Sequence, residues 1–131
     1  MQTPVPTFTR VALRTGPDGR ARFTEETLPL PEGTPASRLS APMAASALQL
    51  RESPVGFRSS MHCTTTPQWV FILQGTMEIG LADGSLRAFG PGEHFYSADV
   101  LPPGETFDAT RHGHWSRQAG AVPLVTAFVR D

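Results

Sequence analysis

Apolar and polar residues alternate along most of this chain, in short runs that are separated by turn residues. Alternation with a period of two is typical of β-strands that have one face against a core. We therefore expect strands over residues 10–14, 20–25, 47–51, 69–74, 76–81, 86–89, 94–97, 114–117 and 124–129. Many short strands with glycine and proline between them favour an all-β sandwich or closed barrel.

Turn residues connect these expected strands. Asp18-Gly19 and Asp83-Gly84 are each flanked by strand-like runs, and an Asp-Gly pair suits a tight hairpin because both positions accept positive φ. Residues 30–42 contain three prolines, a glycine and several small residues, which predicts an extended arm. We expect two parts: residues 1–46, a hairpin and arm that pack on the barrel or on a partner, and residues 47–131, the barrel itself.

Composition narrows the classes of function. A chain of 131 residues fits one domain, and its net charge of −1 gives no sign of a nucleic-acid or membrane surface. All eleven basic residues are arginine, so a Schiff base on lysine is excluded. The single cysteine, Cys63, forms no internal disulfide and suits a reducing compartment. From these features we expect a soluble, cytoplasmic protein.

The candidate functional residues lie between two glycines, Gly56 and Gly75. The segment reads Gly56, five residues, His62, one residue, Thr64, three residues, Gln68, six residues, Gly75. Alternate residues of a strand face the same side, so His62 and Thr64 point into one space and Gln68 shares their parity. Imidazole is a ligand for zinc, copper, iron or nickel, but these three side chains alone are a poor metal site. A further ligand must come from another strand.

This spacing resembles the first motif of the cupin superfamily, which is glycine, five residues, histidine, one residue, histidine, three or four residues, glutamate, six residues, glycine. Thr64 and Gln68 stand where the family has its second histidine and its glutamate. The resemblance extends over residues 47–129. It implies a double-stranded β-helix, also called a jelly-roll barrel, with a divalent metal ion (iron, zinc, manganese or nickel) in its pocket. It also implies a homodimer that pairs through N-terminal strands.

The family's second motif supplies a histidine from a later strand, and two registers compete for it here. If Pro102 and Gly104 are the motif's proline and glycine, its histidine position falls on Phe107. If the frame is set from the downstream end, His114 and Gln118 take the histidine and asparagine positions. We favour the second register, which gives a metal-ligand set of His62, Gln68 and His114.

The favoured register requires a long loop over residues 99–113, and long loops in compact domains are commonly functional. His112 in this loop has the same parity as His114 and is its rival as a ligand. Asp99 has the parity of an inward-facing residue, and we expect it, with Thr64 and His112, in the pocket as a ligand or general base. A turn-capping role for this aspartate is the alternative.

Two functions are compatible with the sequence. The first is a metal-dependent cupin enzyme, of the dioxygenase, lyase or isomerase class, acting on a small organic molecule. The second is a cupin that binds a small molecule without metal or without catalysis, or a metal-free isomerase with a histidine base. A fold alone does not choose between them.

Overall fold

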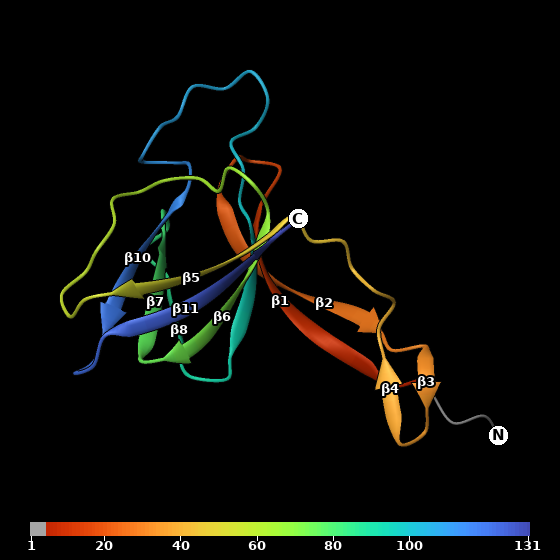
Figure 1. Ribbon diagram of the computed structural model, residues 1–131. Helices are drawn as coiled ribbons and strands as arrows, with labels where there is room; N and C mark the ends of the chain where they lie inside the picture. Colours follow the sequence, from red (N-terminus) through yellow and green to blue (C-terminus); the bar gives the residue numbers. More distant parts are fainter. Residues whose placement is uncertain (1–4) are drawn as a thin grey trace.

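The computed structural model describes residues 5–131, and every regular element in this range is a strand (Figure 1). No helix that could cross a membrane occurs in the described range. The strands are β1 (Thr7–Thr15), β2 (Ala21–Pro29), β3 (Glu32–Thr34), β4 (Ser37–Leu39), β5 (Ala47–Ser53), β6 (Gln68–Gln74), β7 (Thr76–Leu81), β8 (Leu86–Phe89), β9 (His94–Ala98), β10 (His114–Ala119) and β11 (Leu124–Arg130). The all-β prediction is confirmed.

Two sheets enclose the core. One has six strands in the order β2-β1-β9-β6-β11-β5, and the other has three in the order β10-β7-β8. Side chains from both sheets meet in one apolar cluster, which includes Leu13, Val70, Ile72, Ile79 and Phe95. Neighbours in the sheets are mostly distant in sequence, as in the jelly-roll barrel that the motif resemblance implies. The predicted fold class is confirmed.

The tight turns form where Asp-Gly pairs predict them. Asp18-Gly19 joins β1 to β2 and Asp83-Gly84 joins β7 to β8, and both glycines have positive φ. Gly75, at φ 78°, makes the sharp bend between β6 and β7. A side chain there would meet the backbone of Pro123 at 2.8 Å, so the bend also brings two chain segments close together.

The N-terminal part is more closely integrated than a covering arm. β1 pairs with β2 along its whole length and runs parallel to β9, which places this hairpin within the large sheet. Glu26 of β2 is held by Arg10 at 2.7 Å and by Arg14 of β1. The predicted extended arm contains a hairpin that the sequence did not predict, β3–β4, whose residues are all exposed and which projects from the barrel (Figure 1).

The outer face of the six-stranded sheet is apolar. Trp69 and Phe71 of β6 stack on each other at 5.6 Å between ring centroids, and the ring of His94 lies against both. His94 therefore lies on the outer face of the sheet, away from the core. Leu48 and Leu50 of the edge strand β5 continue this face and are 70% and 68% exposed.

Candidate functional site

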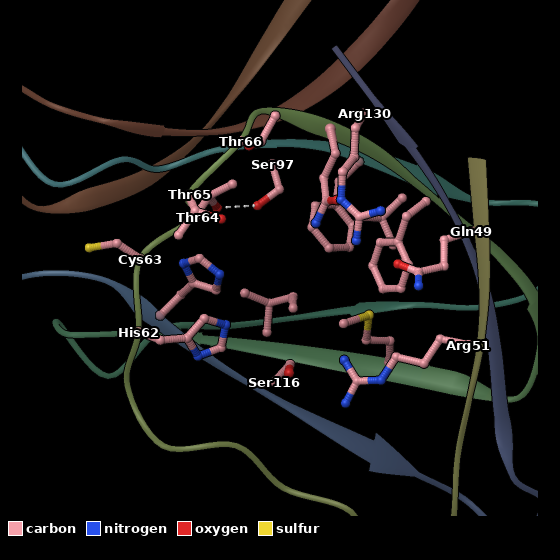
Figure 2. Close-up of a pocket in the computed structure, with 17 residues that line it drawn as sticks. Gln49, Arg51, His62, Cys63, Thr64, Thr65, Thr66, Ser97, Ser116 and Arg130 are labelled. Carbon is pink, nitrogen blue, oxygen red and sulfur yellow. Dashed lines mark hydrogen bonds between the residues drawn. The ribbon is translucent and has the colours of Figure 1, made fainter. Parts of the chain in front are cut away.

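A pocket of about 380 Å³ lies inside the barrel, between the two sheets. A pocket of this size suits a small organic molecule. The strand residues that line it are inward-facing, often at alternate positions, such as Gln49 and Arg51 of β5 or Val70 of β6 (Figure 2). The full lining is Gln49, Arg51, His62, Cys63, Thr64, Thr65, Thr66, Gln68, Val70, Met77, Ile79, Phe95, Ser97, His114, Ser116, Phe128 and Arg130.

His62 and His114 meet at one wall of this pocket. Their backbones form an isolated antiparallel bridge, with His62 N–H donating to His114 O at 2.9 Å and His114 N–H donating to His62 O at 3.0 Å. The two ring centroids are 4.7 Å apart and the rings are tilted by 56°. The structure thus brings together the two histidines that the sequence selected from distant segments.

Asp99 orients the His114 ring from behind. His114 Nδ1 donates to Asp99 Oδ2 at 2.9 Å, and Thr15 Oγ1 donates to the other carboxylate oxygen at 2.8 Å. Asp99 is 0% exposed and does not line the pocket, unlike the sequence expectation. Because Nδ1 carries the proton in this hydrogen bond, Nε2 of His114 has a lone pair in the neutral ring.

His62 is fixed in the same tautomer by its own backbone neighbourhood. Its Nδ1 lies 2.8 Å from the carbonyl oxygen of Ser60, which only accepts, so Nδ1 is the donor. Partial burial lowers the pKa of His62, and the neighbouring His114 and Arg51 lower it further, while the Ser60 carbonyl acts in the opposite direction. The neutral imidazole is therefore favoured near neutral pH.

Thr64 and Gln68 line the pocket, as the sequence predicted. Thr64 Oγ1 is 2.7 Å from Ser97 Oγ, so its hydroxyl is already paired inside the protein. Gln68 differs, because its side-chain Oε1 is buried and has no hydrogen-bond partner. An unpaired buried amide oxygen costs free energy, and a ligand in the pocket can satisfy it.

Two arginines that the sequence analysis did not select complete the pocket. Arg51 of β5 and Arg130 of β11 lie across the pocket from His62 in Figure 2, with Gln49 between them. The Arg51 guanidinium lies 4.6 Å from the centroid of the Phe57 ring. The sequence contains part of the information needed to find them, because both arginines have the inward parity of their strands. Parity alone does not show which face of a strand lines a pocket.

His112 and Cys63 take no part in the pocket's polar surface. His112 is buried in the loop before β10, where its Nδ1 accepts from the Asp108 N–H at 3.0 Å and its Nε2 lies 3.2 Å from Glu105. His112 does not line the cavity. The structure therefore places His114, and not His112, beside His62. The Cys63 thiol points away from the pocket centre (Figure 2), and burial raises its pKa, so the thiolate is disfavoured.

These side chains do not fit a resident divalent metal ion. The donors in the lining are two imidazoles, neutral amides and hydroxyls, and the Cys63 thiol, and among the described residues no carboxylate lines the cavity. Within residues 5–131 no group of three or more His, Cys, Asp or Glu side chains is placed to hold an ion. Catalytic sites for these metals normally have three strong protein ligands, and Arg51 and Arg130 add positive charge that repels a cation.

Comparison with known proteins gives a likeness to solved structures. No protein-family model and no curated protein matches the chain. Among solved structures, the cupin domain of Schizosaccharomyces pombe Cnp3 is similar with probability 1.00, a TM-score of 0.41 and 15% sequence identity, over 95% of this chain and 84% of that one. A likeness at this level concerns the fold and says nothing about the residues of the pocket.

Proposed function

We propose that this protein binds a small organic molecule in its barrel pocket without a resident metal ion. The observation that supports the proposal is the lining itself: two imidazoles, two arginines, hydroxyl and amide groups, and no carboxylate. Such a set recognises a ligand by hydrogen bonds and charge, whereas a catalytic cation needs anionic or more numerous ligands. The metal-dependent dioxygenase or lyase suggested by the motif resemblance has no comparable support.

The pocket's polarity is arranged for an amphipathic ligand. His62, His114 and Thr64 lie at one wall, and the floor is formed by apolar side chains that include Val70, Ile79 and Phe95. Ligand pockets typically combine an apolar lining with a few convergent polar groups that fix orientation. The unpaired Gln68 oxygen can accept a hydrogen bond from a donor group of the ligand.

A metal-free proton transfer is the second candidate, and one observation favours it. The buried Asp99 carboxylate holds His114 with its proton on Nδ1, which leaves Nε2 free of protein partners as a base. A carboxylate that accepts from Nδ1 also stabilises the imidazolium formed when Nε2 takes a proton. A histidine base held by a carboxylate is the group that an isomerase needs to move a proton within a small substrate.

Metal analysis of protein purified without chelator tests the proposal. We expect no stoichiometric iron, zinc, manganese or nickel, and no rise in melting temperature when equimolar Zn²⁺ or Ni²⁺ is added. The His62→Ala and His114→Ala variants should give the same result as the outward-facing control, His94→Ala. A stoichiometric ion that is lost in both pocket variants and kept in the control would overturn the proposal.

A further inference from the structure

We infer that the ligand of this pocket is a small organic anion, whose carboxylate or phosphate group is held by Arg51 and Arg130. The inference rests on the proposed binding function and names the class of molecule bound. Both guanidinium groups line the same cavity, and they come from strands that pair side by side, β5 and β11. Arginine presents a rigid fork of donors that matches the oxygens of carboxylates and phosphates.

The two pocket arginines are not neutralised by the protein. Among the described residues, five other arginines form ion pairs with acidic side chains: Arg10, Arg14, Arg22, Arg111 and Arg117. Arg51 and Arg130 are among the six described arginines that form none, although the chain has 12 acidic residues and a net charge of −1. Asp99, at the His114 wall, is already occupied by two hydrogen-bond donors. The cavity is therefore locally positive in a protein that is slightly negative.

The strand register places two glutamine side chains near Arg130. On β11, Phe128 is opposite Gln49 of β5, and Arg130 is opposite Gln68 of β6. Gln49, Gln68 and Arg130 all line the cavity, so two amides flank the charged group. Amide N–H groups donate to anion oxygens, which adds hydrogen bonds to the charge.

The apolar part of the cavity lining indicates that the anion is organic. The lining also includes the apolar side chains Val70, Phe95 and Phe128, and a bare inorganic ion would leave this surface without contacts. An organic body fills it, and its far end reaches His62 and His114. A cationic ligand has no partner here, because none of the lining residues is acidic.

Paired probes test the charge of the ligand directly. Benzoate and phenyl phosphate are compared with their neutral counterparts, benzamide and phenol, within a panel of small carboxylates and matched amides. Binding is measured by titration in ¹H–¹⁵N NMR, which also locates the site. We expect at least one anion to shift pocket resonances and to bind about tenfold more tightly than its neutral counterpart, since hydrogen bonds to a charged group are the stronger ones.

Variants assign the effect to the two arginines. Arg51→Gln and Arg130→Gln should each weaken the best anion about tenfold and leave its neutral counterpart within twofold. Arg38→Gln is the matched control, because Arg38 lies in the exposed β3–β4 hairpin away from the pocket, and it should change neither.

Each contrary result has a distinct meaning. If neutral probes bind the pocket as tightly as anions, or if both pocket variants bind like Arg38→Gln, the anion inference is wrong and the binding function stands. If inorganic phosphate binds as tightly as every organic anion, the ligand is not organic and the inference also fails. If no probe binds, the anion inference is wrong. If a stoichiometric metal ion is found, the proposed metal-free function is wrong.

Discussion

The backbone of His62 exchanges two hydrogen bonds with the backbone of His114, which fixes the two imidazoles 4.7 Å apart at one wall of the pocket. The bridge is isolated from the regular strands, and only one other bridge, Arg58 to Arg117, ties the same segment to β10 in the described part of the chain. Hydrogen bonds from Ser116 N–H to Ser59 Oγ and from Gly56 N–H to Gln118 Oε1 also tie this segment to β10.

Gly113 lies directly against the backbone of His62. Its φ is +84°, and a Cβ there would lie 2.5 Å from the carbonyl oxygen of His62. Gly113→Ala should therefore both strain the backbone and push the bridge apart. We expect it to lower the free energy of unfolding by about 1–3 kcal/mol, measured by denaturant titration, and to shift the NMR resonances of His62.

Gly120→Ala separates these two effects. Gly120 has nearly the same φ, +83°, but a Cβ there has open space around it. It should show the cost of the backbone conformation alone, and therefore a smaller loss. Equal losses in the two variants would mean that the close approach to His62 contributes nothing.

The hydrogen bond from His114 to Asp99 determines which ring nitrogen is free. Asp99→Asn replaces the buried carboxylate with a neutral amide, and a hydrogen bond to a charged group is worth about 1.5–3 kcal/mol. We expect a loss of unfolding free energy in this range. ¹⁵N NMR of the imidazole should also show a smaller fraction of the Nδ1–H tautomer of His114. An unchanged tautomer would show that Asp99 does not orient the ring.

Glu26 makes the stability of the β1–β2 hairpin depend on pH. Hydrogen bonds from Arg14 first, and then from Arg10, lower the pKa of Glu26 from 4.5 to about 2, against the opposing effect of burial. Because the folded-state pKa is the lower one, this contribution is fully present above pH 4.5 and is lost as pH falls toward 2. Glu26 is partly solvated, so we expect a contribution of about 0.5–1 kcal/mol.

Glu26→Gln should remove this part of the acid dependence. Thermal melts at pH 6 and at pH 3 should differ less for this variant than for the unsubstituted protein. Glu25→Gln is the control, because Glu25 is the exposed neighbour on the same strand. If both variants keep the full acid dependence, other carboxylates are responsible for it.

The homodimer expected from the sequence stays a prediction, and the outer sheet face gives it a test. Leu48 of the edge strand is opposite Val129, which is opposite Trp69, so an apolar row crosses three strands. Exposed apolar faces and edge strands are usually covered in the native assembly. Sedimentation should show a dimer that Leu50→Arg dissociates and that Leu86→Arg, on the small sheet, leaves intact. A monomeric unsubstituted protein would contradict the prediction.

Local pattern was enough to predict the class of fold. The strands at 69–74 and 124–129 and the Asp-Gly hairpins are signals within a few residues, because alternation and positive φ are properties of the local chain. His62 and His114 were selected through the resemblance to the two cupin motifs, with strand parity in support. The extended arm was predicted as irregular chain, and its β3–β4 hairpin was missed because no run there alternates.

The sequence by itself thus determined most of the strands and their turns, and together with the motif resemblance it selected His62 and His114. Only the tertiary structure decided that Arg51 and Arg130 share a cavity with those histidines, that Asp99 lies behind the His114 ring, and that His112 is buried elsewhere. The physical reason is that parity assigns a side chain to a face of its own strand. The charge and the partners inside the barrel depend instead on the register between strands that are far apart in the chain.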